Sequence, residues 1–161
     1  RTAKQLYSLM KKQAHGIHII LDWGWNVAGS VDIWSLNSFW FYGLREGTLR
    51  EEDIKPSWLV NDVKNNEGLY YIGSILMDER LEGAYRKKVS QLLKSWINDY
   101  FVREMNMRER CKLLWVVSTE SGRRLAHSWW MYAISCETDV TNSQKRVELL
   151  LSDRSDFPFL T

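Results

Sequence analysis

The stretch LYYIGSILMDERLEGAYRKKVSQLLKSWINDY, residues 69–100, decides the fold class, because it joins a strand pattern to a helix pattern. Its first part, Leu69 to Leu76, is rich in β-branched and aromatic residues and predicts a strand. Asp78 is a suitable N-cap for the helix that follows. Apolar residues then recur at spacings of three and four, at Leu81, Tyr85, Val89, Leu92, Leu93, Trp96 and Tyr100. This spacing predicts an amphipathic helix of about six turns.

Toward the carboxyl terminus, two apolar runs flank a polar turn. Lys112 to Ser118 predicts a strand, and Leu125 to Ile134 predicts a second strand that runs back beside it. Between them, Glu120 to Arg124 is polar and contains a glycine, which is typical of a turn. We therefore expect a hairpin with a basic tip, followed by a shorter helix over residues 142–152.

Toward the amino terminus, short β-like runs alternate with turn signals. Leu6 to Met10 and Ile17 to Trp25 predict two strands, and the glycine that ends Gln13 to Gly16 favours a turn between them. Ser30 is a suitable N-cap for a short helix. The polar and charged residues 43–53 predict a loop.

These elements give the order β-β-α-loop-β-α-β-β-α in a single domain over residues 1–161. No internal repeat, low-complexity stretch or Pro/Gly/Ser-rich linker divides the sequence. Strands joined by turns, with helices between them, indicate an α+β domain. We expect a curved antiparallel sheet backed by about three helices on one face.

The composition limits the classes of function. The chain has 161 residues and a formal net charge of +2, which is too small for broad phosphate neutralisation of a nucleic acid. Nine tryptophans are more than a domain of this size readily buries, so some are expected to line a pocket or an interface. Cys111 and Cys136 lack CxxC spacing and are expected to be buried thiols. No apolar run reaches the ~18 residues of a membrane span.

Motifs that mark enzymes are absent from the sequence. The histidines His15, His18 and His127 lack metal-ligand spacing, and no metal site is expected. There is no glycine-rich phosphate loop and no nucleophile elbow. A Ser/His/Asp or Cys/His triad stays open, because its members lie far apart along a chain. We therefore expect a non-enzymatic domain without a cofactor.

Five short motifs, taken in order, resemble the translation initiation factor 4E family, which binds the 5′ cap of mRNA. Ser30–Leu36 (SVDIWSL) looks like the family's Val-Glu-Asp-Phe-Trp, and Asp53–Trp58 (DIKPSW) is similar to its Gly-Ile-x-Pro-Met-Trp. Asn66–Ile72 (NEGLYYI) resembles its Gly-Gly-Arg-Trp and the strand that follows. Leu81–Tyr85 resembles its Leu-Asp-x-x-Trp helix, and Ser121–Ala126 resembles its lysine-rich hairpin tip.

The resemblance implies the family's cupped antiparallel sheet backed by three helices, and binding of the 7-methylguanosine cap in translation initiation or its regulation. In such a site two aromatic rings sandwich the positively charged base, a carboxylate binds the guanine edge, and basic side chains bind the phosphates. Trp58 matches one stacking ring, and His15 and His18 stand where the second ring is expected. Trp129 or its neighbour Trp130 matches the N7-methyl region, and Arg123 and Arg124 match the phosphate ligands. Asn61 and Asp62 are the nearby substitutes for the residue that binds the base edge.

The same resemblance implies a protein partner. Trp34 matches a tryptophan that binds helical peptides of scaffold or repressor proteins such as initiation factor 4G. On the long helix, Arg86 and Lys87 replace an apolar and an acidic residue of the family, so the peptide is expected to be acidic. The expected partners are capped mRNA or a 7-methylguanosine nucleotide and this peptide, with no membrane contact. The domain is expected to be monomeric and cytoplasmic, with the nucleus as a further location.

Two departures from the family leave alternatives open. Leu59 stands where the family has its base-binding glutamate, and no tryptophan stands among residues 15–18, where the family places its second ring. The first alternative is a protein-interaction module of the same fold whose cap site is lost or altered. The second is a cap-binding domain of a viral polymerase, which has an unrelated fold.

Overall fold

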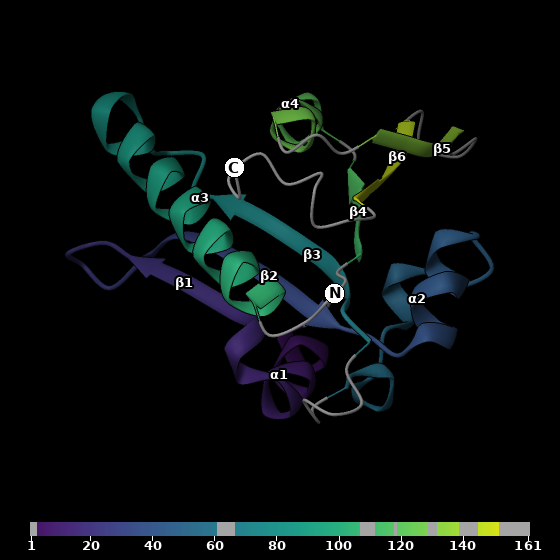
Figure 1. The fold of residues 1–161 in the computed structure, drawn as a ribbon. Helices are drawn as coiled ribbons and strands as arrows, with labels where there is room; N and C mark the ends of the chain where they lie inside the picture. Colours follow the sequence, from purple (N-terminus) through teal and green to yellow (C-terminus); the bar gives the residue numbers. More distant parts are fainter. Residues whose placement is uncertain are drawn as a thin grey trace.

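A single mixed sheet organises the protein. The computed structural model describes residues 3–60, 67–106, 112–117, 119–128, 132–138 and 145–151. Six strands form the sheet in the order β1-β2-β3-β4-β6-β5 (Figure 1). Their bounds are β1 Ile17–Leu21, β2 Val27–Ser35, β3 Leu69–Met77, β4 Lys112–Val117, β5 Tyr132–Thr138 and β6 Lys145–Leu151. The fold is α+β as expected, but β3 and β4 run parallel, so the expectation of an antiparallel sheet is wrong.

Helices and single 3-10 turns connect the strands in the described part of the chain. The α-helices are α1 Ala3–Lys12, α2 Ser38–Arg45, α3 Gly83–Asn106 and α4 Glu120–Ser128. The 3-10 turns are η1 Ala14–Gly16, η2 Glu51–Asp53 and η3 Pro56–Trp58. Helix α2 begins where the Asn37 side chain accepts a hydrogen bond from the Trp40 amide at 3.1 Å. Among the described residues, no helix combines the length and apolar character that a bilayer span requires.

The sheet separates two hydrophobic cores. On one face, α3 packs against β1, β2 and β3, in a core that includes Val31, Ile72, Val89, Leu93 and Ile97. Figure 1 shows α3 lying across this face. On the other face, α1, α2 and η3 contribute to a second core, which includes Leu9, Trp34, Phe41, Trp58 and Tyr71. We call these the α3 face and the α1/α2 face.

The long helix and three strands confirm the sequence pattern. Helix α3 has 24 residues and begins at Gly83, five residues beyond the predicted cap Asp78. Of the predicted apolar positions, Val89, Leu93 and Tyr100 are buried on its sheet side, whereas Tyr85 and Leu92 are exposed. Strands β3 and β4 match their predicted runs closely, and β1 begins at the predicted Ile17.

Two predictions in the amino-terminal part are wrong. The run from Leu6 to Met10, predicted as a strand, lies in α1, because one side of that helix can bury Leu9 in the core. The helix predicted to begin at Ser30 is strand β2 instead. β2 is paired on both sides, by β1 and β3, and its β-branched Val31 and Ile33 suit this central position.

Three further predictions need correction. The expected loop 43–53 is partly helical, since α2 continues to Arg45 and η2 occupies its end. The expected hairpin tip and the start of its return strand form α4, where Thr119 Oγ1 accepts a hydrogen bond from the Gly122 amide in the manner of a helix cap. Within the expected helix 142–152, the described residues form strand β6, which pairs with β4 on one side and β5 on the other.

Candidate active site

Strands β3 and β4 lie side by side at one end and part at the other. They pair over Leu69–Ile72 and Lys112–Trp115. Beyond this segment, β3 continues to Met77 paired with β2, while β4 continues to Val117 paired with β6. Figure 1 shows the two strands running apart. No strand of the described chain therefore pairs with the β4-facing edge of residues 73–77, which leaves backbone hydrogen-bonding groups for another partner.

A β-bulge marks the point of parting. On β2, Asp32 and Ile33 are consecutive, but their partners on β3 are Ser74 and Ile72. Gly73 is therefore the extra residue and has no counterpart in the ladder between β2 and β3. A bulge bends its strand and re-aims neighbouring groups, and bulges are over-represented next to active sites. This feature places the candidate site at Gly73.

The start of α3 lies one short loop beyond the same strand. The first intrahelical hydrogen bond runs from the Arg86 amide to the Glu82 carbonyl at 3.2 Å. The amides of Gly83, Ala84 and Tyr85 precede this bond, so they are donors that the helix itself does not satisfy. Gly83 has a φ of 53°, and nothing lies within 4 Å of the position that a Cβ would occupy there. An anion can approach this helix end, where the helix dipole also favours negative charge.

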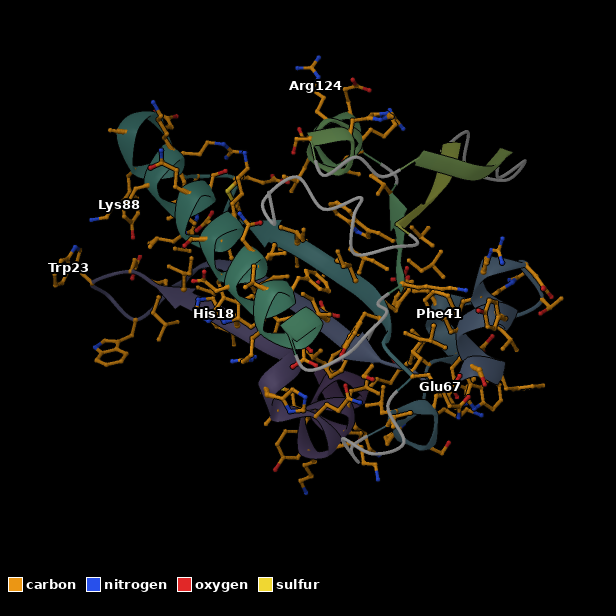
Figure 2. All side chains as sticks on the ribbon, viewed as in Figure 1. His18, Trp23, Phe41, Glu67, Lys88 and Arg124 are labelled. Carbon is orange, nitrogen blue, oxygen red and sulfur yellow. The ribbon has the colours of Figure 1, made fainter. Side chains whose placement is uncertain are left out.

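Charged side chains surround this helix end. Arg80 pairs with Asp78 at 2.7 Å, and hydrogen bonds from the Arg80 side chain and backbone lower the pKa of Asp78 to about 2. Arg86, Lys87 and Lys88 are exposed on the first two turns of α3. Figure 2 shows Lys88 on the outer side of the helix. The start of α3 thus combines backbone amide donors with long, exposed cationic side chains.

A buried polar cluster lies across the ladder from the bulge. Asp32 is only 5% exposed, although it stands in the middle of β2. Its carboxylate accepts a hydrogen bond from Trp34 Nε1 at 2.6 Å and another from Ser74 Oγ. Asp32 and Trp34 are two residues apart on a strand, so both point toward the α1/α2 face. Ser74 directly follows Gly73 and is half-buried.

The α1/α2 face is open to solvent just beyond Ser74. Leu76 on β3 and Ile19 on β1 are both paired with the same β2 residue, so they share this face. Leu76 is 59% exposed and Ile19 is 45% exposed. Ser74 therefore lies at the border between the covered and the open part of the face.

A second carboxylate contact lies on the covered side of this border. Tyr71 Oη donates a hydrogen bond to Glu51 Oε2 at 2.6 Å. Tyr71 is fully buried on β3, before the bulge, and Glu51 belongs to η2. The contact ties η2 to the strand that carries the bulge.

Helix α4 carries the two predicted phosphate ligands. Arg123 and Arg124 pair with Glu120 at 3.0 Å and 3.2 Å. Hydrogen bonds from Arg123 and then Arg124 lower the pKa of Glu120. Figure 2 shows Arg124 pointing outward, while Ala126 packs into the α3 core. The two arginines thus lie on a helix surface and are engaged with a carboxylate of the same helix.

The tryptophans predicted for base stacking and partner binding are buried. Trp58 stacks on Trp40 with ring centroids 3.8 Å apart and 6° between the ring planes. Trp34 is fully buried and donates its indole N–H to Asp32. Trp34 therefore offers no surface to a helical peptide, and Trp58 offers no free ring face to a base.

The other predicted residues are spread over the molecule. His15 is exposed in η1, and Arg86 and Lys87 are exposed on α3. His18 on β1 stacks on Trp96 of α3, with ring centroids 4.9 Å apart, and its burial lowers its pKa. Four predicted residues lie outside the described residues: Asn61, Asp62, Trp129 and Trp130.

The structure does not gather the predicted set into one site. Trp58 belongs to the core of the α1/α2 face, whereas α4, with Arg123 and Arg124, packs on the α3 face through Ala126. In the part of the chain that the structure describes, no group of His, Cys, Asp and Glu is placed to hold a metal ion. The polar groups that the fold does gather are those at the bulge and at the start of α3.

The sequence contains signals for some of the residues that were missed. Gly73 interrupts a run of β-branched and aromatic residues, and a lone glycine in a strand pattern indicates a bulge. Gly83 stands at the start of the helical periodicity, where a glycine exposes backbone amides. Asp32 and Ser74 carry no such signal, because their contact depends on the pairing of β2 with β3.

No protein-family model and no curated protein matches this chain. Solved structures match it at low sequence identity. The C-terminal condensation domain of Ebony in complex with β-alanyl-dopamine has a TM-score of 0.56 at 8% identity, covering 92% of this chain and 76% of that one. A chimera of the spermidine N-acetyltransferase SpeG from Vibrio cholerae and hSSAT has a TM-score of 0.53 at 13% identity, covering 96% and 79%. Mutant forms of the spermidine/spermine N-acetyltransferase SpeG from Vibrio cholerae have a TM-score of 0.52 at 14% identity, covering 94% and 76%.

These matches overturn the resemblance to the initiation factor 4E family. The expected cap binding, the role in translation, and the partners, capped mRNA and an initiation factor 4G-like peptide, are wrong, and the two alternatives gain no support. The expectation of a non-enzymatic domain is contradicted by the same comparison, since the SpeG structures are acetyltransferases. The motifs misled because each is short: Ser30–Leu36, matched to a helix start, lies in β2 and the residue after it. The chain therefore has the fold that these acetyltransferases and the condensation domain share.

Proposed function

We propose that this chain is an N-acyltransferase, which transfers an acyl group from a coenzyme A thioester to an amine. SpeG is a spermidine N-acetyltransferase, and β-alanyl-dopamine, bound by Ebony, is itself an amide of an amine. The observation that carries the proposal is the parting of β3 from β4 at Gly73, one loop before the start of α3. An open strand edge followed by a helix N-terminus suits a long donor that has an amide-containing arm and a phosphate group.

The donor arm fits the open edge of β3. The pantetheine arm of coenzyme A is extended and contains amide groups, which pair with backbone groups much as an added strand does. Residues 73–77 offer such an edge toward β4. The thioester end of the arm would then lie near Gly73, and the phosphates would lie toward the loop after Met77.

The phosphates of the donor fit the start of α3. The amides of Gly83, Ala84 and Tyr85 point out of the first helical turn, where anions are favoured. The missing side chain of Gly83 leaves the space that a phosphate needs to approach the backbone. Exposed Arg86 and Lys87 add positive charge at the same helix end.

The bulge suits the chemistry of acyl transfer. When bound, the thioester supplies an activated carbonyl carbon, on whose oxygen negative charge develops as an amine attacks. Backbone N–H groups that are fixed before the reaction stabilise such charge well. Gly73 has no counterpart in the β2 ladder, so its backbone is available for this role. The amine would approach on the α1/α2 face, which is open at Leu76 and Ile19.

Donor binding is tested first, by calorimetric titration with coenzyme A and acetyl-coenzyme A. Valine in place of Gly83 would cover the helix amides and is disfavoured at a φ of 53°. We expect Gly83→Val to weaken donor binding at least about tenfold, a loss of about 1.4 kcal/mol. Gly47→Val is the matched control, because Gly47 also has a positive φ, of 72°, but lies just after α2. Equal weakening in both variants, or no binding to wild-type protein at millimolar donor, would contradict the proposal.

Acyl transfer is tested next with acetyl-coenzyme A and a panel of amines. The panel contains a polyamine, an arylalkylamine and a peptide α-amine, and the release of free thiol is followed together with the acetylated product by mass spectrometry. Formation of the amide with at least one amine supports the proposal. Thiol release without an amide product from any amine would instead indicate a thioesterase.

A further inference from the structure

Ser74 Oγ carries one hydrogen, and the structure shows where it goes. Ser74 donates this hydrogen to Asp32 Oδ1. A hydroxyl whose hydrogen is committed in this way can only accept further hydrogen bonds, through its oxygen lone pairs. Because Ser74 is half-buried at the open border of the α1/α2 face, an arriving N–H group meets an acceptor there.

The contacts of Asp32 fix the direction of the hydrogen bond that Ser74 donates. Aspartate is depleted from strands and is almost never fully buried unless it is paired. Here its Oδ2 accepts the indole N–H of Trp34 at 2.6 Å, and Trp34 is itself fully buried in the core. The carboxylate is therefore oriented by a rigid group of the fold, with Oδ1 directed to Ser74.

We propose that Ser74 Oγ accepts the N–H of the attacking amine, and that Asp32 is the positioning residue that makes Ser74 an acceptor. This inference rests on the proposed acyl transfer and assigns the amine side of the same site. The two reactants then meet at the bulge, with the thioester on the backbone of Gly73 and the amine on the next side chain, Ser74. The carboxylate of Asp32 also stabilises the positive charge that develops on the amine nitrogen during attack.

The step balances as a proton relay. The amine nitrogen forms a bond to the thioester carbonyl carbon, and its N–H becomes acidic as the nitrogen gains positive charge. This proton passes to Ser74 Oγ while the hydrogen of Ser74 passes to Asp32 Oδ1. The carbon–sulfur bond then breaks, the thiolate leaves with the electron pair, and the proton on Asp32 neutralises it directly or through solvent. The products are an amide and a free thiol, and Asp32 is again a carboxylate.

The test compares four variants for kcat and KM, using the amine that wild-type protein acetylates best. Ser74→Ala removes the acceptor and is expected to lower kcat about a hundredfold, the typical contribution of one positioned acid–base group. Ser74→Thr keeps the hydroxyl and should retain most of kcat. Asp32→Asn should lower kcat at least as much as Ser74→Ala does. The asparagine amide would donate to Ser74 Oγ and turn the hydroxyl hydrogen toward the amine. The double variant Asp32→Asn/Ser74→Ala should be no slower than Asp32→Asn alone, since no misdirected hydroxyl remains.

Two controls separate this role from a structural one. Ser95→Ala makes the same change at an exposed position of α3, far from the start of the helix and from the α1/α2 face, and should leave kcat unchanged. The KM for acetyl-coenzyme A should stay at the wild-type value in Ser74→Ala, because the proposed donor contacts do not include the Ser74 side chain. If the wild-type protein transfers the acyl group and Ser74→Ala has the same kcat, this inference alone is overturned. The same holds if the kcat losses of the two single variants multiply in the double variant. A wild-type protein that acetylates no amine would overturn the proposed function and this inference together.

Discussion

Trp40 and Trp58 stack face to face, with ring centroids 3.8 Å apart and 6° between the ring planes. Trp40 belongs to α2 and Trp58 to η3, so the stack joins two segments that are separated by the loop containing η2. Trp58 is 3% exposed. The aromatic residue that sequence comparison assigns to a ligand thus serves to hold the α1/α2 face together.

Replacing Trp58 by alanine should destabilise the fold strongly. Loss of a buried tryptophan ring leaves a cavity, and we expect a decrease of about 3–5 kcal/mol in the free energy of unfolding, measured by urea denaturation. Trp23→Ala is the control, because Trp23 is 98% exposed at the turn between β1 and β2, where Figure 2 shows it pointing outward. A loss under about 1 kcal/mol for Trp58→Ala would mean that the stack is not formed in solution.

The backbone at Trp25 should become less strained when a glycine replaces the tryptophan. Trp25 has a φ of 63°, in the left-handed region that bulky residues avoid, and its side chain is 82% exposed. We expect Trp25→Gly to raise the midpoint of thermal unfolding by a few degrees, about 2–4 °C per kcal/mol for a chain of this size. Trp23→Gly makes the same change without a positive φ and should not raise it. Equal midpoints for the two variants would argue against this conformation of the turn.

The stability of the protein should fall in mildly acidic solution because of His18. Burial lowers the pKa of His18 from 6.5, so the unfolded chain takes up a proton at a pH where the folded chain resists it. The unfolded state then binds more protons, and the free energy of unfolding decreases as the pH falls below about 6.5. His18→Phe keeps a ring against Trp96 and should show a smaller decrease between about pH 7.5 and pH 5. An NMR titration midpoint of His18 at or above 6.5 would contradict this account.

The ion pair between Arg80 and Asp78, in the loop before α3, should be visible in the pKa of the Asp78 carboxyl group. Arg80 lowers the pKa of Asp78 to about 2 through side-chain and backbone hydrogen bonds. In Arg80→Gln, the NMR titration midpoint of the Asp78 carboxyl group should rise toward 3.8, its ordinary value. Asp78 would then carry its proton at a higher pH than in the wild-type protein. A midpoint that does not move on substitution would show that Arg80 does not hold this carboxylate.

Local sequence patterns correctly predicted the elements in which buried residues recur at a regular spacing. The spacing of Val89 and Leu93 identifies the buried side of α3, and the apolar runs at β3 and β4 are strands. The pattern around Ser30 failed because a serine before apolar residues resembles a helix cap, whereas pairing with two neighbouring strands decided the structure. The turn predicted at Glu120 to Arg124 failed because a threonine before polar residues also suits a helix start, and Thr119 Oγ1 caps α4 there.

The candidate site could not be predicted from local sequence patterns, because it is formed by the pairing of strands that are distant in the sequence. The parallel register of β3 on β4 joins Ile72 to Trp115, which are far apart in the sequence, and it decides where the strands part. The contact of Ser74 with Asp32 likewise spans two strands. Tryptophan content pointed to an exposed aromatic pocket, but Trp34 and Trp58 are needed in the core.

In the proposed complex, a coenzyme A thioester binds between the parted strands and the start of α3. Titration of the 15N-labelled protein with coenzyme A, followed by mapping of the backbone amide shifts, locates the bound donor. We expect the largest shifts on residues 73–77 of β3 and on Gly83, Ala84 and Tyr85 of α3, and we expect Gly83→Val to reduce both sets together. Shifts that fall elsewhere, or no shifts at millimolar coenzyme A, would contradict the proposed complex.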